Sequence, residues 1–461
     1  MRKEKHDFIC AVLANSLLCH LAKHLLALDC DRGIIVKVMK MGKLVTVLAL
    51  VATPLLVSGM PVAAANAVPK PPKVGDACTK SGDVDGKLFC QLKNGKLKWN
   101  EPMLPAGEYK LGFEALTSGA AAFAGVPLAQ GVRLAVAQIN ASGFLGKGAT
   151  IKLIEQDSGG SAANAIAAVN AFKAQGVSGV VCCALSSQAG AVAPILKAAG
   201  IPGIIDSAVL PGLAQPPYMY RPVVLLGTSG GPNSKLIDTV VKKYKTKSAV
   251  VAVTADNQGM VTDKDTFVEA LGKASVKTVN TVNTAAADTD LSGAASQITA
   301  LNPEMVVISM LGGPGTRLVK ALRERGYKGV IVSNYGIGDQ NNFTIGGSAL
   351  ADAIFPVIYF PASPANAMAK KFAADYKVYA KEDSSIYGAQ GFTAMMLLAS
   401  GLKASGDGNP VNVALALSQI TRFNTVYGPL AFAGGQGSLA KGVDPSYVTW
   451  TSTGTQKIWK P

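Results

Sequence analysis

Residues 177–208 read VSGVVCCALSSQAGAVAPILKAAGIPGIIDSA, and this stretch decides the fold class. Its two ends, residues 177–184 and 201–208, are short apolar runs rich in valine and isoleucine, as is typical of buried strands. The segment between them has apolar residues at helical spacing and ends on Gly200, a residue type that commonly terminates helices. A strand, a helix and a second strand in this order predict two parallel strands connected by a helix that covers the sheet.

The same alternation continues on both sides of this stretch. Strands are expected at 109–116 and 149–157, and helices at 126–143 and 161–176. A second series of alternating helices and strands runs from residue 233 to residue 336. Such alternation builds parallel sheets with helices on both faces. The sequence therefore predicts an α/β fold with two doubly wound parallel-sheet lobes and a cleft between them.

The composition excludes a disordered chain and does not favour nucleic-acid binding. Of 461 residues, 49% are hydrophobic and 16% are charged, which allows a large core. The net charge is +15, and one basic run holds Lys242, Lys243, Lys245 and Lys247. This run closes a predicted helix, where cations suit the helix dipole, and lacks the interleaved aromatic residues of a nucleic-acid site. We expect no nucleic-acid partner; a positive field favours anionic ligands or a cell-envelope surface.

The N-terminal part of the sequence predicts export. Residues 44–60, LVTVLALVATPLLVSGM, follow the basic KMGK and precede a small-residue site at Ala65-Asn66-Ala67. We interpret 39–67 as a secretory signal peptide cleaved before Val68; the alternative is a membrane anchor kinked at Pro54. Residues 1–38 are interpreted as an extension from a start codon assigned too early. No cysteine directly follows the apolar run, so we expect no lipoprotein anchor, and a location in the periplasm or outside the cell.

The distribution of histidine argues against an enzyme. All histidines, His6, His20 and His24, lie within residues 1–38. Residues 68–461 therefore cannot assemble a Ser-His-Asp triad, a Cys-His dyad or a histidine-ligated metal. The run Gly227-Thr228-Ser229-Gly230-Gly231 fits the pattern of a nucleophile elbow, but no histidine base is available to it. We expect no catalytic residues, no metal site and no cofactor.

Four cysteines remain after the signal peptide. Cys78 and Cys90 flank a turn-rich loop within residues 68–107, and in an exported chain they predict a disulfide that closes a small module ahead of the main body. Cys182 and Cys183 are adjacent at the end of an apolar strand. Because neighbouring cysteines bond to one another only with strain, we expect buried free thiols there.

Several local motifs follow one another in a characteristic order. They are the T-x-G turn of Thr117 and Gly119, the pair Phe123 and Gly125, AQINASG within 135–143, EQDSGG at 155–160, LSSQAGAVAPI at 185–195, IIDSAVLPGL at 204–213, SMLGGPGTRLVKALRERGYKG at 309–329 and YGAQGFTAMMLLASGLKASG at 387–406. In this order they resemble the branched-chain amino-acid-binding (Leu/Ile/Val-binding-like) proteins of ABC importers, which have the type I periplasmic-binding-protein fold. The resemblance spans about residues 108–455.

This resemblance implies a monomeric solute-binding protein that closes its lobes on a small molecule and delivers it to an importer permease. The implied ligand is a branched-chain amino acid or a related carboxylate or amide. We assign 108–228 and 357–425 to the first lobe, and 229–356 and 426–461 to the second. The alternative function is a sensor or envelope-surface module of the same fold, with the Cys78–Cys90 module as its interaction element.

The candidate ligand-binding residues lie where predicted strands end. Ligands of doubly wound sheets sit beyond the strand carboxyl ends, near the N–H groups that begin the next helix. Ser186 and Ser187 stand at such a point and can offer donors to a carboxylate; taken alone, they are equally typical of a plain helix cap. The resemblance implies ligand contacts there and at equivalent places. The full candidate set is Leu185, Ser186, Ser187, Ser207, Ala208, Val209, Phe123, Thr117, Gln258, Gly312, Tyr335 and Asp256.

Three of these positions depart from the pattern of the resembled family. Val209 stands where relatives commonly have a threonine, Tyr335 where amino-acid binders have a carboxylate for the ligand's ammonium, and Gln258 where an aromatic residue is usual. A buried ammonium without an acidic partner is costly. Either one of Asp206, Asp256 and Asp339 replaces the missing carboxylate, or the ligand has no amine.

Overall fold

The computed structural model describes residues 72–440 and 444–461. The extension 1–38, the signal peptide 39–67 and the cleavage site before Val68 lie outside the described residues and stay predictions.

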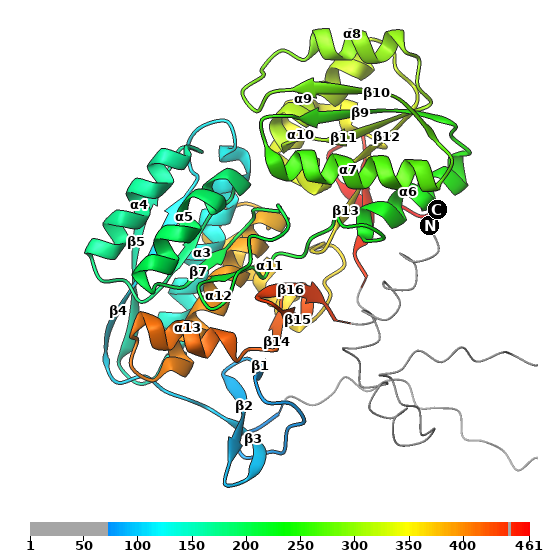
Figure 1. Cartoon of the computed structure of the whole chain (residues 1–461). Helices are drawn as coiled ribbons and strands as arrows, with labels where there is room; N and C mark the ends of the chain where they lie inside the picture. Colours follow the sequence, from blue (N-terminus) through cyan, green and yellow to red (C-terminus); the bar gives the residue numbers. More distant parts are fainter. Residues whose placement is uncertain (1–71, 441–443) are drawn as a thin grey trace, which may run out of the picture. The chain divides into compact units, whose positions relative to one another are not determined.

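The first lobe is built on a five-stranded sheet in which all neighbouring strands are parallel. Its strands are β4 (Gly107–Ala115), β5 (Ala149–Asp157), β6 (Val180–Cys182), β7 (Gly203–Ile205) and β8 (Met219–Tyr220), in the order β5-β4-β6-β7-β8. Helices α4 (Ala162–Ala174) and α5 (Ser186–Ala199) pack on one face, and α3 (Ala122–Ser142) and α12 (Ile386–Ser405) on the other (Figure 1). The stretch that decided the fold class is β6, α5 and β7.

The second lobe is built on a seven-stranded sheet. Its strands are β9 (Ser248–Thr254), β10 (Lys277–Thr284), β11 (Met305–Ser309), β12 (Val330–Ser333), β13 (Ile354–Val357), β17 (Ser446–Trp450) and β18 (Gln456–Ile458), in the order β10-β9-β11-β12-β13-β17-β18. The pairs from β10 to β13 are parallel, whereas β17 and β18 add antiparallel strands at one edge. Helices α6 (Pro232–Tyr244) and α7 (Gln258–Lys273) cover one face, and α8 (Ser292–Ala300) and α9 (Gly312–Glu324) the other. The predicted α/β fold with two lobes is confirmed.

Shorter elements complete the lobes. Helices α11 (Ala367–Ala380) and α13 (Pro410–Ser418) belong to the first lobe, and η1 (Tyr335–Gly338), α10 (Gln340–Gly346) and η2 (Gly347–Leu350) follow β12 in the second. Helix α3 alone among the helices of residues 72–440 and 444–461 is long and apolar enough to cross a membrane. Its apolar side chains pack in the core of the first lobe, so we interpret it as a core helix.

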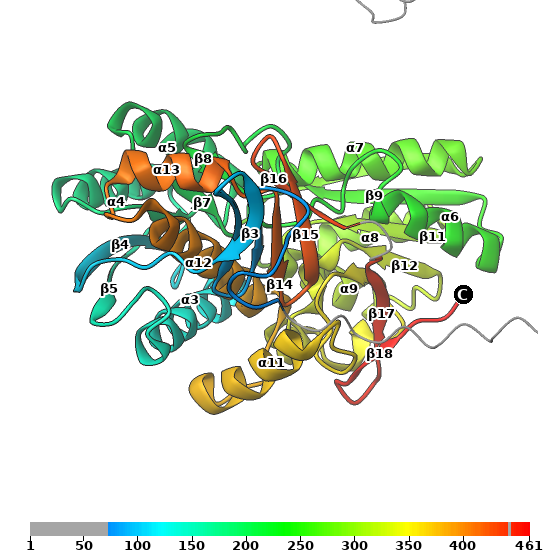
Figure 2. The ribbon, with the colours of Figure 1, turned by 90° about the horizontal axis from the view of Figure 1, so that it is seen from below.

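A third sheet joins the N-terminal module to a late part of the chain. Its strands are β1 (Asp83–Asp85), β2 (Leu88–Lys93), β3 (Lys96–Asn100), β14 (Arg422–Thr425), β15 (Gly428–Ala433) and β16 (Gln436–Leu439), in the order β16-β15-β14-β1-β2-β3. In Figure 2, β14, β15 and β16 run through the middle of the view, with the first lobe on one side and the second on the other. The link is the parallel pairing of β1 with β14, which places Val84 opposite Phe423.

This sheet corrects the expected boundary of the second lobe. The sequence assigned 426–461 to that lobe, but β15 and β16 belong to the third sheet, and β17 and β18 join the sheet of the second lobe. The reason is local: a tight turn connects β14 to β15, so the two strands pair as a hairpin and remain in one sheet.

The N-terminal module is closed by the predicted disulfide and is fixed to the first lobe. Cys78 and Cys90 are bonded, with their Cα atoms 5.9 Å apart. Lys403 of α12 is fully buried, and its ammonium lies 3.2 Å from the Glu101 carboxylate and 4.9 Å from the centre of the Phe144 ring. A buried cation needs such a partner. The ion pair and the β1–β14 pairing together hold the module against this lobe.

The expectation of free thiols at Cys182 and Cys183 is wrong. Both residues are buried, as predicted, but their sulfurs are joined in a vicinal disulfide. Side chains of neighbouring strand residues normally point to opposite faces. Here β6 ends at Cys182, and Cys183 has a φ of 80°, which breaks that alternation and brings both side chains into one cluster behind the sheet.

Candidate ligand-binding site

A cavity of about 50 Å³ lies between the two lobes. The first lobe contributes the ends of β4, β6 and β7 with the starts of α3 and α12, and the second lobe contributes the starts of α7 and α9 with the segment after β12. We call this space the main cavity. Its lining residues are Leu116, Ala121, Phe123, Ala124, Ala184, Leu185, Ser186, Ser207, Val209, Asn257, Met260, Met310, Leu311, Gly312, Asn334, Tyr335, Gly336 and Tyr387.

The structure brings most of the expected site residues to this cavity and leaves the others outside it. Those that line the main cavity are Phe123, Leu185, Ser186, Ser207, Val209, Gly312 and Tyr335. Those that do not line it are Thr117, Ser187, Ala208, Asp256 and Gln258. Ser187, Asp256 and Gln258 are exposed, and Ala208 is buried in the core behind the sheet. A ligand role for these five residues has no support from their positions.

Ser186 is the polar residue at the start of α5 that faces the cavity. Ser186 is not the capping residue of this helix. Leu185 is the capping residue, and Ser186 is the first residue of the helix. Ser186 is 4% exposed, and its hydroxyl oxygen accepts a hydrogen bond from the backbone N–H of Leu210 at 3.2 Å. The hydroxyl proton therefore remains available to donate to a ligand oxygen.

The loop that carries Val209 is held by a buried arginine. Arg221 is 1% exposed, and its guanidinium donates to the backbone oxygens of Ala208 at 3.1 Å and of Leu210 at 2.7 Å. It also donates to the side chain of Gln436 in β16 at 2.6 Å. Because Arg221 binds the carbonyls on both sides of Val209, it fixes this part of the cavity wall to the third sheet.

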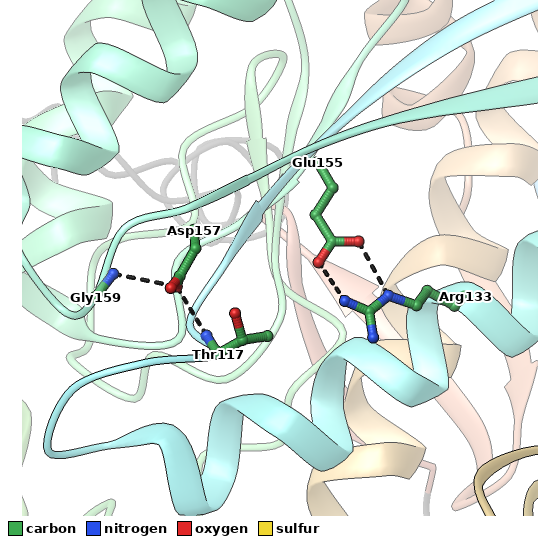
Figure 3. Close-up of polar contacts among 5 residues, drawn as sticks. All are labelled: Thr117, Arg133, Glu155, Asp157 and Gly159. Atoms are coloured by element: carbon green, nitrogen blue, oxygen red, sulfur yellow. Dashed lines mark hydrogen bonds and ion pairs between the residues drawn. The ribbon is translucent and has the colours of Figure 1, made fainter.

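Thr117 has a structural role close to the cavity. Asp157, at the end of β5, accepts hydrogen bonds from the backbone N–H groups of Thr117 at 2.8 Å and Gly159 at 3.2 Å (Figure 3). Gly119 has a φ of 80°, and a Cβ there would lie 2.3 Å from the carbonyl oxygen of Gly159. The T-x-G and EQDSGG motifs therefore pack against each other and shape the loop ahead of α3. Figure 3 also shows Arg133 of α3 paired with Glu155 of β5, which ties the helix to the same strand.

Residues from the two lobes touch across the cavity. A Cβ on Gly259 of α7 would lie 2.7 Å from the Ser186 hydroxyl and 3.0 Å from the nearest Val209 methyl. Likewise, a Cβ on Gly312 of α9 would lie 2.5 Å from the ring of Phe123. Ligand pockets usually enclose about 300–1,000 Å³, several times the volume here. The lobes are therefore close together, and a ligand must part them to enter.

Aromatic rings form one wall of the main cavity. The rings of Phe123 and Tyr387 lie 6.0 Å apart edge to face, and the rings of Tyr335 and Tyr387 lie 6.0 Å apart. Such contacts suit the packing of an apolar ligand body. Tyr387 was not among the sequence candidates, although it begins the YGAQG motif.

None of the three acids suggested by the sequence lines the main cavity. Asp206 is fully buried, and neither of its carboxylate oxygens has a hydrogen-bond partner within the described part of the chain; burial raises its pKa well above the ordinary value. Asp256 is exposed and accepts from the N–H of Ala286. Asp339 caps α10 through the N–H of Asn341.

A different acid lies beside the main cavity. Asp263 of α7 lines a second cavity of about 20 Å³, which we call the side cavity. Val209, Met260, Asn334 and Tyr335 line both cavities, so the two adjoin. Burial raises the pKa of the Asp263 carboxyl to about 6, although hydrogen bonds from neighbouring side chains oppose this rise. Within residues 72–440 and 444–461, no group of three or more His, Cys, Asp or Glu side chains is placed to hold a metal ion.

Comparison of the sequence with models of known protein families identifies the family of this chain. A family model for periplasmic binding proteins matches residues 108–449. The chain belongs to the periplasmic binding protein family. The match confirms the resemblance predicted from the motifs, and it begins after the N-terminal module.

Individual relatives of this periplasmic binding protein are distant. It is 25% identical over 309 residues to the leucine-, isoleucine-, valine-, threonine- and alanine-binding protein of Pseudomonas aeruginosa, covering 66% of this chain and 79% of that protein. A branched-chain amino acid transporter substrate-binding protein from Streptococcus pneumoniae, solved with isoleucine, is 22% identical with a TM-score of 0.67, covering 77% of this chain and all of that one. An ABC transporter solute-binding protein from Rhodopseudomonas palustris, solved with 3,4-dihydroxybenzoic acid, is 18% identical with a TM-score of 0.65, covering 74% of this chain and 93% of that one. The names of these relatives describe binding proteins, which agrees with the sequence-based expectation that this chain is a solute-binding protein and not an enzyme.

Proposed function

We propose that this chain is the exported solute-binding protein of an ABC importer and that it binds a small carboxylate-bearing ligand by closure of its two lobes. The observation that carries the proposal is the main cavity, because candidates from several separate strand ends and helix starts meet there. This is the place where doubly wound sheets bind ligands.

The carboxylate of the ligand binds at the start of α5. Ser186 offers a hydroxyl proton there, and the first N–H groups of the helix favour a negative charge. The positive net charge of the chain also attracts a negatively charged ligand, over longer distances.

The body of the ligand is small and apolar. Leucine, alanine, methionine and aromatic side chains form most of the cavity wall. The relatives named above include one named for binding leucine, isoleucine, valine, threonine and alanine, and one solved with 3,4-dihydroxybenzoic acid. We therefore place the ligand among small apolar or aromatic carboxylates, including branched-chain amino acids.

A thermal-shift screen of amino acids, their deaminated acids and their amides tests this function. A ligand that binds the folded state raises its melting temperature according to concentration and affinity. We expect stabilisation by carboxylates. If no carboxylate in the screen stabilises the protein, the proposal is wrong.

A second candidate function is a sensor or envelope-surface protein of the same fold. It is favoured by the N-terminal module, which lies outside the family match and is fixed to the first lobe by β1, β14 and Lys403. Genes for a permease and an ATPase next to this gene would favour the importer. Retained ligand uptake in a strain without the protein would favour the sensor.

A further inference from the structure

Glu114, a buried acid of the first lobe, holds the loop that leads into α5. It lies at the end of β4 and is 1% exposed. One of its carboxylate oxygens accepts a hydrogen bond from the backbone N–H of Cys183 at 2.9 Å. The other accepts from the side-chain amide of Gln188 at 3.1 Å. These two contacts flank residues 184–186, all of which line the main cavity.

Gln188 extends this support to the first turn of α5. Its side-chain oxygen accepts a hydrogen bond from the backbone N–H of Leu185 at 3.1 Å, and its amide nitrogen also donates to the Ser158 hydroxyl at 2.8 Å. Gln188 and Ser158 are both fully buried. Among these side chains, Glu114 alone can gain or lose a proton near neutral pH. The loop at the ligand site is therefore held by a network whose charge depends on Glu114.

The titratable neighbours of Glu114 are acids, Asp157 at the end of β5 and Asp206 after β7. Burial acts to raise the pKa of Asp157, but hydrogen bonds, including those from Ser118 and Gly159, outweigh it and lower that pKa. Asp206 is fully buried, and burial holds its pKa well above the ordinary value. Within residues 72–440 and 444–461, the groups that shift the pKa of Glu114 include no lysine or arginine. An ionised Glu114 therefore lacks a countercharge.

Glu114 changes its charge near neutral pH. Burial raises the pKa of its carboxyl to about 7, although hydrogen bonds oppose this rise. The adjacent Cys182 and Cys183 are joined in a disulfide and do not titrate. The Glu114 side chain is therefore mostly neutral at pH 6.5 and mostly ionised at pH 8.5.

An ionised Glu114 and a ligand carboxylate depend on the same helix end. The first N–H groups of α5 carry a partial positive charge that stabilises an anion. With an ionised Glu114 bonded to the loop and a ligand carboxylate at Ser186, two negative charges would share this end in buried surroundings. Like charges at one site favour the neutral form of one of them. A bound carboxylate therefore favours the protonated form of Glu114.

We propose that Glu114 is the positioning residue of the carboxylate site and that ligand binding is coupled to the uptake of a proton by Glu114. This inference rests on the proposed function. The neutral side chain allows a ligand carboxylate at the start of α5, and the ionised side chain opposes it. The protein therefore binds its ligand more tightly in a mildly acidic medium and releases it more readily as the pH rises through 7.

Calorimetry at two pH values tests the coupling. The probes are leucine, valine, 4-methylpentanoate and 3-phenylpropanoate, whose carboxyl groups are ionised at both pH 6.5 and pH 8.5. If the bound carboxylate raises the pKa of Glu114 by about one unit, the tightest-binding probe should bind the wild-type protein roughly fivefold more weakly at pH 8.5 than at pH 6.5. In Glu114→Gln, whose amide does not titrate, this ratio should fall below about twofold. Glu108→Gln, at an exposed position of the same strand, should keep the wild-type ratio.

A measurement on the wild-type protein keeps the test valid if Glu114→Gln does not fold. Titration in two buffers of different ionisation enthalpy gives the number of protons taken up per ligand bound. With a pKa of about 7 in the free protein and about one unit more in the complex, about half a proton should be taken up at pH 7.5. Asp263, with a pKa of about 6, is mostly ionised at this pH, and burial raises the pKa of the Tyr335 phenol above 10. Neither group therefore accounts for the uptake.

The outcomes separate this inference from the proposed function. An affinity that does not fall between pH 6.5 and pH 8.5, or binding without proton uptake at pH 7.5, overturns the coupling and leaves the carboxylate-binding function intact. A folded Glu114→Gln protein that keeps the wild-type ratio also overturns the coupling. Failure of every probe to bind at either pH overturns the proposed function itself and, with it, the coupling.

Discussion

Ser186 and Ser187 are neighbours in the sequence but have different surroundings. Ser186 is buried at the main cavity, whereas Ser187 is exposed on the outer side of α5. The sequence predicts both as candidates because both stand at the start of a helix after a strand. Which of two adjacent residues faces the cleft depends on the residue at which the helix begins. Here Leu185 is the capping residue, so the helix begins at Ser186.

Ser186→Ala should weaken ligand binding by roughly 10- to 100-fold, since a hydrogen bond to a charged group contributes roughly 1.5–3 kcal/mol. Ser187→Ala is the matched control and should leave affinity unchanged. Calorimetry with the ligand found by the screen measures both variants. Equal affinity of Ser186→Ala and the wild-type protein would remove Ser186 from the site.

Glu114 gives the ligand-free protein a pH-dependent stability. This residue at the end of β4 is 1% exposed, and burial raises the pKa of its carboxyl from 4.5 to about 7, against hydrogen bonds that lower it. The folded state therefore holds a proton that the unfolded state has lost between about pH 4.5 and pH 7. Stability from this group is fully present below pH 4.5 and is lost as the pH rises to 7, by about 3 kcal/mol.

Glu114→Gln should flatten this fall in stability, because the amide stays neutral at every pH. The free energy of unfolding, measured by urea denaturation from pH 5 to pH 8, checks the expectation. Glu108→Gln, at an exposed position of the same strand, is the control and should keep the wild-type profile. A Glu114→Gln profile as steep as that of the wild-type protein would contradict the assignment.

Two residues beside the cavities were not predicted from the sequence. Asp263 lies within α7, and Tyr387 lies at the start of α12. Candidate residues at strand ends can be found because parallel strands end at one edge of a sheet. A residue on a helix reaches the cleft when that helix face turns toward the other lobe, and its own sequence context does not reveal this.

At the scale of elements, local patterns predict the two lobes but not the third sheet. Each βα unit combines short apolar strands with helical periodicity, and neighbouring units pair with one another. By contrast, β1 and β14 are short strands from opposite ends of the chain, and their pairing depends on how the first lobe folds. The vicinal disulfide was missed for a similar reason, since it depends on the positive φ of Cys183.

A methyl group added to helix α7 where it contacts the first lobe should weaken ligand binding. In Gly259→Ala, the new Cβ would force the Ser186 hydroxyl to rotate or the lobes to separate by a few tenths of an ångström. We expect roughly tenfold weaker ligand binding, with little change in the melting temperature of the ligand-free protein. Gly272→Ala, on the same helix with open space around it, is the matched control. Unchanged affinity in Gly259→Ala would argue against closure at this contact.

At the scale of the whole molecule, the predicted signal peptide would determine which residues form the mature protein. We predict that the exported protein begins near Val68. N-terminal sequencing of the exported protein tests this prediction, and an exported protein that keeps residues 44–60 would contradict it.

The central claim is that the two lobes close on a carboxylate held at the start of α5. Calorimetric titration of the best ligand from the screen, compared with its primary amide, tests this claim most directly, because the amide has nearly the same size and shape as the carboxylate but carries no charge. We predict that the carboxylate binds at least about tenfold more tightly than the amide, and that this difference shrinks in Ser186→Ala. Equal binding of the two compounds by the wild-type protein would contradict the account.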